Sequence, residues 1–98
     1  MLQKGEKEEW LKELSLEKEH LEREREALKT EEERLIGRIE VLRNLVGHGE
    51  MRGDMREDAK RELAEYDARL KNARNEKEER TRKLRYIGMK EEGIEDVD

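Results

Sequence analysis

The stretch LVGHGEMRGDM, residues 45–55, places Gly47, Gly49 and Gly53 in the middle of a chain that otherwise has the pattern of charged helix. Glycine is among the least favourable residues inside a helix, so a cluster of glycines interrupts one. We therefore predict a Gly-rich turn over residues 47–53, where one helix ends and another begins. The turn decides whether the chain is one long rod or a hairpin.

The composition limits the class of protein. Of the 98 residues, 52% are charged and 32% are apolar, with no proline, cysteine or phenylalanine and a single tryptophan. A deep globular core is excluded, and such a composition is typical of long helices or coiled coils, although disordered chains share its low hydropathy. Without cysteine, neither a disulfide framework nor a thiolate zinc site can form. The composition is compatible with both helix and disorder, so the spacing of the apolar residues has to distinguish between them.

The first half of the chain repeats leucine at a strict seven-residue interval. The repeat consists of Leu14, Leu21, Leu28, Leu35 and Leu42. A straight helix drifts by about 20° per heptad away from such a stripe, so the repeat predicts a left-handed supercoil with a partner helix. An isolated helix held by charge pairs is the alternative, but it needs no apolar stripe. We expect helix over residues 6–46, after a frayed N-terminus at residues 1–5.

A second helix is predicted over residues 54–87. Asp54 is a favourable N-cap, and acidic Glu57 and Asp58 follow in the first turn, where the helix dipole favours negative charge. Apolar residues then recur at alternating intervals of four and three. The remaining residues, 88–98, hold five acidic residues against one lysine and are expected to form a flexible acidic tail.

The distribution of charge predicts how the two helices pair. Residues 6–26 hold nine acidic and five basic residues, a net charge of −4, whereas residues 71–85 hold three acidic and seven basic residues, a net charge of +4. Folding back at the turn brings these segments together. We therefore predict an all-α antiparallel coiled-coil hairpin, with two hairpins pairing into a four-helix dimer. The predicted interaction seam consists of Leu11, Leu14, Leu21, Leu28, Leu35, Ile39, Leu42, Val46, Ala59, Leu63, Tyr66, Leu70, Leu84 and Ile87.

Aliphatic side chains crowd the last turns of the first helix, and one neighbouring helix cannot cover all of them. Ile36, Val41 and Leu45 are therefore predicted to form a surface for a partner. The partner is a second hairpin or a helix of a different protein.

Three candidate sites in and near the turn carry little weight. Arg52, Gly53 and Asp54 spell an adhesion tripeptide, but such tripeptides recur by chance, and Gly53 and Asp54 have structural roles in the turn and the cap. His48 and Glu50 with Asp54 lack any recognised metal-ligand spacing. No nucleophile lies beside a histidine. We expect no catalytic, metal, cofactor or small-molecule site.

The basic stretch KNARNEKEERTRKLR, residues 71–85, is the best nucleic-acid candidate. It contains three glutamates and has no aromatic residue before Tyr86, and the net charge of the whole chain is −5, so these features argue against nucleic-acid binding. No segment approaches the roughly 20 apolar residues of a membrane span, and no secretory signal follows Met1. The expected location is intracellular, cytoplasmic or nuclear, without membrane association or secretion.

The expected function follows from the helices and not from a site. We expect a non-enzymatic coiled-coil module for oligomerisation and protein–protein interaction within a larger assembly. The alternative is a docking hairpin for one specific folded partner, such as a small GTPase, which would use the apolar surface near the turn.

Overall fold

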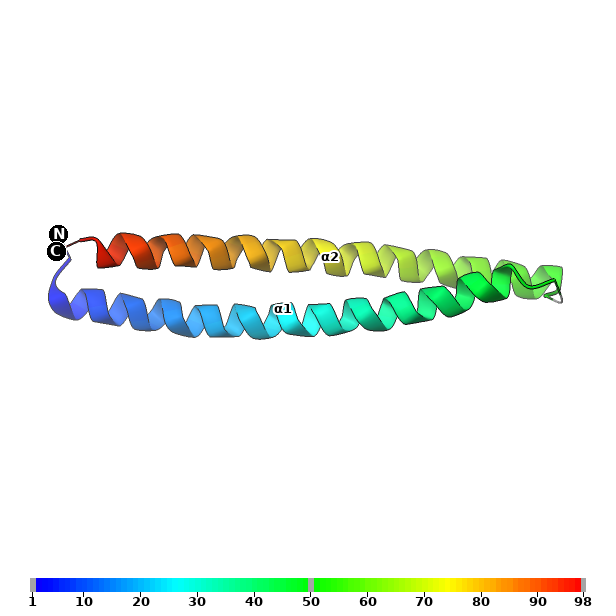
Figure 1. The fold of residues 1–98 in the computed structure, drawn as a ribbon, viewed down its shortest axis with the longest axis horizontal. Helices are drawn as coiled ribbons and strands as arrows, with labels where there is room; N and C mark the ends of the chain where they lie inside the picture. Colours follow the sequence, from blue (N-terminus) through cyan, green and yellow to red (C-terminus); the bar gives the residue numbers. More distant parts are fainter. Residues whose placement is uncertain (1, 50, 98) are drawn as a thin grey trace. The chain divides into compact units, whose positions relative to one another are not determined.

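The computed structural model of this chain describes residues 2–49 and 51–97. It contains two α-helices, α1 (Lys4–Val46) and α2 (Gly53–Glu95), and the fold is an all-α helical hairpin with no strand among the described residues (Figure 1). Three helix ends carry a charge that matches the helix dipole, since Glu6 and Asp54 lie in the first turns of their helices and Arg43 lies in the last turn of α1, whereas the last turn of α2 has no basic residue.

The chain divides into two compact units, and each contains a stretch of both helices. We call Met1–Ala27 together with Lys77–Asp98 the terminal unit, and Leu28–Glu76 the loop unit. Each unit has its own small apolar core, as expected for a chain with too few apolar residues for a deep one.

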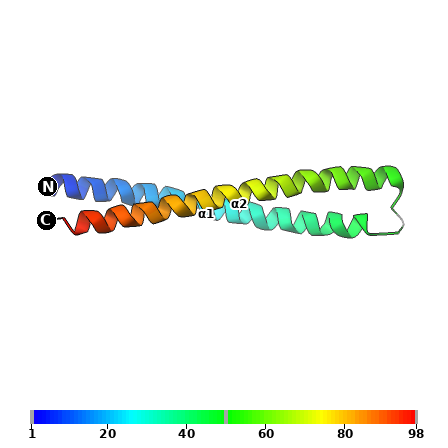
Figure 2. The same ribbon diagram turned by 90° about the horizontal axis from the view of Figure 1, so that it is seen from above.

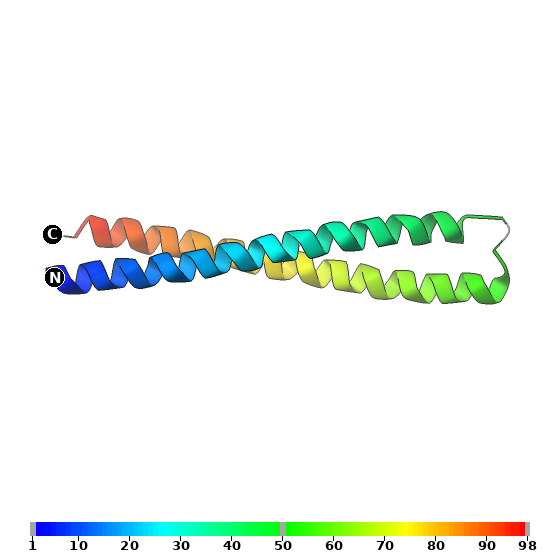
Figure 3. The same ribbon diagram turned by 90° about the horizontal axis from the view of Figure 1, so that it is seen from below.

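In the terminal unit, the beginning of α1 (blue) lies next to the end of α2 (red) in Figures 2 and 3. The Nζ atom of Lys7 donates a hydrogen bond of 3.1 Å to the carbonyl oxygen of Val97, and Lys18 lies 3.7 Å from Glu91. The core of the unit contains the buried residues Leu14, Leu21, Ile87 and Ile94, against which Leu2, Leu11 and Leu84 pack.

The loop unit is held by a second apolar core and by ion pairs between its helices. Arg69 of α2 lies 3.5 Å from Glu31 of α1, and Arg74 lies 3.2 Å from Glu32. The core contains Leu35, Ile39 and Leu70, with Ile36, Leu63 and Tyr66 packed against it.

The connection between the helices is short and uses local hydrogen bonds. The amide nitrogen of Gly47 donates to the carbonyl oxygen of Arg43 at 3.1 Å, and that of Met51 donates to the carbonyl oxygen of His48 at 3.2 Å. None of the described glycines has a positive φ angle. The turn therefore does not require glycine for left-handed backbone, and Gly53, which was expected to end the turn, is the first residue of α2.

The helices extend further than expected from the sequence. α2 continues to Glu95, whereas the expected helix ended at residue 87 and residues 88–98 were expected to be flexible. Ile94 lies seven residues after Ile87, so it continues the heptad and is buried, with only 3% of its surface exposed. A glycine inside a helix lowers the stability of the helix by about 1 kcal/mol relative to alanine. Burial of an isoleucine side chain such as Ile94 contributes about 1.5–3 kcal/mol, which outweighs that loss. At the other end, α1 begins at Lys4, within the segment 1–5 that was expected to fray.

Candidate interaction surface

The residues of the predicted seam lie between the two helices of each unit. Buried members of the seam are Leu14, Leu21, Leu35, Ile39, Leu42, Ala59, Leu70 and Ile87. Half-buried members are Leu11, Leu28, Val46, Leu63, Tyr66 and Leu84. Ala73 and Ile94 are also buried, although neither was among the predicted seam residues. These side chains hold one chain together, so a surface for a partner has to lie elsewhere.

The three residues of the predicted partner surface have different surroundings. Val41 and Leu45 are exposed, at 58% and 44% of their surface, whereas Ile36 is half-buried and packs against the core of the loop unit. Ile36 follows Leu35 directly and packs against the cluster of Leu35, Ile39 and Leu70. The structure therefore leaves Val41 and Leu45 as the uncovered aliphatic side chains of this set.

An open groove of about 500 Å³ lies beside Val41. Its lining combines apolar Leu42 and Tyr66 with Gly37, and with the charged residues Arg34 and Arg38. A Cβ atom added at Gly37 would meet nothing within 4 Å, so the glycine leaves open space in the middle of α1. The groove can accept an apolar side chain of another molecule.

The groove is also lined by Glu33 and Glu62, and its two arginines are engaged within the loop unit. Nη1 of Arg38 donates to the hydroxyl oxygen of Tyr66 at 3.1 Å, and its guanidinium lies 5.6 Å from the centre of that ring. Nη2 of Arg34 donates to both carboxylate oxygens of Glu31 at 2.7 Å. This hydrogen bond, together with the positive charges of Arg34, Arg69 and Arg38, lowers the pKa of Glu31 against a smaller opposing effect of desolvation. The groove therefore presents apolar surface together with the carboxylates of Glu33 and Glu62.

The structure gives little support to the other candidate sites in the turn. The carboxylate of Asp54 accepts a hydrogen bond of 2.9 Å from the amide of Met55, and the side chain of Met55 is 58% exposed. Glu50, one of the considered metal ligands, lies outside the described residues. In residues 2–49 and 51–97, no three histidine, aspartate or glutamate side chains are grouped as a metal ion requires.

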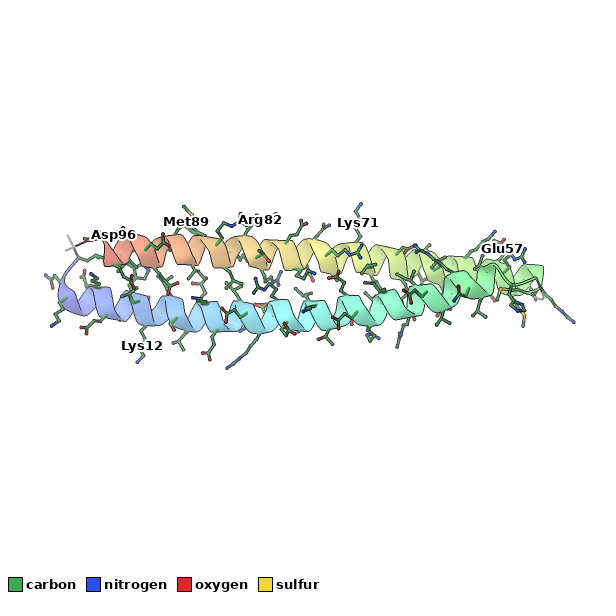
Figure 4. All side chains as sticks on the ribbon, in the orientation of Figure 1. Lys12, Glu57, Lys71, Arg82, Met89 and Asp96 are labelled. Carbon is green, nitrogen blue, oxygen red and sulfur yellow. The ribbon has the colours of Figure 1, made fainter. Side chains whose placement is uncertain are left out.

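The basic stretch of α2 is partly neutralised by α1. Arg74 contacts Glu32 in the loop unit, and Arg80 contacts Glu24 in the terminal unit. Lys71 and Arg82 instead point away from α1, as Figure 4 shows. The cations left at the surface are therefore scattered among acidic neighbours, which does not favour a phosphate-binding track.

Comparisons with protein-family models, with curated protein sequences and with solved structures find no match for this chain. Within the described part of the chain, neither helix contains an apolar segment that would span a bilayer. We therefore infer the role of the candidate surface at Val41 and Leu45 from the structure of this chain alone.

Proposed function

We propose that this chain is a non-enzymatic antiparallel coiled-coil hairpin that acts as a module for oligomerisation and protein–protein interaction within a larger assembly. The single observation that carries the proposal is the exposure of Val41, which lines an open groove, and of Leu45 four residues later, in a chain that covers most of its other aliphatic residues. Exposed apolar surface of this kind is typical of a site at which another protein binds.

The order of the contacts in each unit supports antiparallel pairing. In the terminal unit, Lys7 contacts Val97 whereas Glu24 contacts Arg80, so residue numbers rise along α1 as they fall along α2. Burial of the heptad leucines toward the other helix is what a coiled coil requires. The charged seam residues Lys18 and Arg80 each face a carboxylate, which favours this orientation over a parallel one.

Pairing of two hairpins into a four-helix dimer is the form of association that we favour. Full burial of an aliphatic side chain contributes about 1.5–3 kcal/mol, so covering Val41 and Leu45 on two copies supplies a useful part of the free energy of dimerisation. Because these side chains are clustered in the last turns of α1, one contact between loop units covers them together.

The groove beside Gly37 also supports a second form of the same proposal. A folded partner, such as a small GTPase, would insert an apolar side chain between Val41 and Tyr66, as many helical docking surfaces accept one. The mass of the isolated chain in solution separates the two forms. A dimer at micromolar concentration favours self-association, and a monomer favours docking to a different protein.

Substitution with glutamate tests the assignment of faces. We expect Leu42→Glu to unfold the hairpin, because Leu42 is buried, whereas Val41→Glu and Leu45→Glu should remain helical and lose association only. Far-ultraviolet circular dichroism measures helicity, and analytical ultracentrifugation measures mass. Equal loss of helicity in all three variants would show that the faces are assigned wrongly, and unchanged association of the Val41 and Leu45 variants would contradict their role.

A further inference from the structure

On each helix of the terminal unit, one aromatic and two charged side chains follow one another at the same spacing. The two charges are negative on α1 and positive on α2. On α1 the set is Trp10, Glu13 and Glu17, and on α2 it is Lys83, Tyr86 and Lys90. Each set is an aromatic residue with two like charges at intervals of three and four residues, which places its members along one side of a helix. Glu13, Glu17 and Lys83 are exposed, as are Trp10 at 38% and Tyr86 at 60%.

Two contacts place these sets on the same side of the unit. Trp10 of α1 and Lys90 of α2 line one groove of about 290 Å³, together with Gly93 and Val97. The Nζ atom of Lys90 lies 4.3 Å from the centre of the Tyr86 ring. We call the side chains of Trp10, Glu13, Glu17, Lys83, Tyr86 and Lys90 the mixed-charge face.

We propose that the mixed-charge face binds the same face of a second copy of this chain, around a two-fold axis parallel to the helices. Such a rotation lays α1 of one copy over α2 of the other, so Glu13 and Glu17 of each copy meet Lys83 and Lys90 of the second. The inference rests on the proposed role in oligomerisation, but it uses residues of the terminal unit and none of the loop unit.

Charge complementarity favours a second copy of this chain as the partner of the mixed-charge face. Stacking α1 on α1 would put glutamate against glutamate, which is unfavourable, whereas the two-fold arrangement brings the glutamates of α1 near the lysines of α2. Lys83 also lies 3.2 Å from Glu79 of its own helix, so a second copy would share this lysine with Glu79. An acidic or a basic partner would match only one of the two helices. A face that carries one sign on each helix is complementary to itself.

Packing favours the same contact. Trp10 and Tyr86 are of the residue types that contribute most at protein interfaces, and both are uncovered in the isolated chain. Gly93, which lines the groove with Trp10, has nothing within 4 Å of an added Cβ, so a second copy can approach its backbone closely.

Tryptophan fluorescence of the full chain tests this pairing directly, because Trp10 is the only tryptophan. With increasing concentration, we expect its emission to shift to shorter wavelength while the mass in ultracentrifugation doubles. A basic variant, Glu13→Lys with Glu17→Lys, and an acidic variant, Lys83→Glu with Lys90→Glu, should each raise the dissociation constant at least about tenfold. An equal mixture of the two variants should restore both the shift and the doubled mass, since their faces are complementary.

A matched control changes the net charge by the same amount as the basic variant, but at positions outside the mixed-charge face. Glu8→Lys with Glu22→Lys substitutes exposed residues that lie, by helix geometry, far around α1 from Trp10 and Glu17, and it should pair like the unmodified chain. Circular dichroism should show equal helicity for every variant. A variant with lower helicity is replaced by its neutral form, Glu13→Gln with Glu17→Gln or Lys83→Gln with Lys90→Gln, which should still weaken pairing.

Several results would overturn the inference. They are a monomer at all accessible concentrations, a doubled mass without a change in Trp10 emission, and a mixture of the charge variants that stays monomeric. If Val41→Glu and Leu45→Glu reduce the mass while the charge variants do not, the proposed function stands and the mixed-charge face is not the interface. The opposite result assigns self-association to the terminal unit and leaves Val41 and Leu45 for a different partner.

Discussion

The guanidinium of Arg80 on α2 reaches the carboxylate of Glu24 on α1, with Nη2 of Arg80 3.3 Å from Oε2 of Glu24. Arg80 lies in the seam, four residues before Leu84, where an apolar residue would continue the heptad. Its Nε atom is buried without a hydrogen-bond partner, and Glu24 also lies 3.1 Å from Nε2 of His20. The terminal unit thus tolerates an incompletely satisfied cation in its seam because a carboxylate of the other helix faces it.

A double-mutant cycle with Glu24→Gln and Arg80→Gln should find a modest coupling. Both side chains are partly exposed, so we expect about 0.2–1 kcal/mol of coupling in the free energy of unfolding, decreasing as salt is added. Urea denaturation followed by circular dichroism measures it. A coupling above about 2 kcal/mol that ignores salt would show that the pair is far better shielded from water than the structure indicates.

Ile94→Ala should destabilise the chain by about 2–5 kcal/mol, because it removes a buried side chain from the core of the terminal unit. Met89→Ala is the matched control, since Met89 lies in the same part of α2 but is 64% exposed, and Figure 4 shows it pointing away from α1. The control should change stability by less than about 0.5 kcal/mol. If both substitutions have equally small effects, residues 88–95 do not pack in solution as the structure places them.

Gly37→Ala should stabilise the isolated hairpin by about 0.5–1 kcal/mol. Gly37 lies inside α1, where alanine is a better helix former, and the added Cβ meets nothing within 4 Å. Thermal denaturation at low protein concentration measures the gain. A loss of stability there would mean that the space above Gly37 is occupied even in the isolated chain, whereas a gain combined with weaker association would place a partner over this glycine.

Acidification should weaken the hairpin in a way that depends on Glu31 and Glu79. Hydrogen bonds from Arg34 to Glu31 and from Lys83 to Glu79 lower the pKa of each carboxyl, with further help from nearby cations. A group whose pKa is lower in the folded state stabilises that state above its unfolded pKa, and the contribution is lost as pH falls through the folded pKa.

The measurement is the melting temperature between neutral pH and about pH 3, which spans the glutamate range. It should fall less in Glu31→Gln than in the unmodified chain, because that variant has lost the titrating group. Glu62→Gln, which replaces an exposed glutamate of α2, is the control and should show the same fall as the unmodified chain. Identical curves for all three would contradict the role of Glu31.

The seam and the turn were predictable because both depend on local pattern. Leucine at every seventh residue marks one side of α1, and the glycines at 47 and 49 mark its end, without knowledge of any distant residue. The end of α2 was not predictable in the same way. Gly88 was interpreted as a boundary, but the burial of Ile94 depends on Leu14 and Leu21 across the unit, which local helix propensity does not report.

The sequence by itself determined that there are two helices, where the break between them lies and which residues form their apolar stripes, since these follow from spacing along one chain. Only the tertiary structure decided that Ile36 is covered while Val41 and Leu45 are not, and that Arg80 meets Glu24. The physical reason is that exposure and ion pairing depend on where the second helix lies, and the periodicity of one helix does not contain that position.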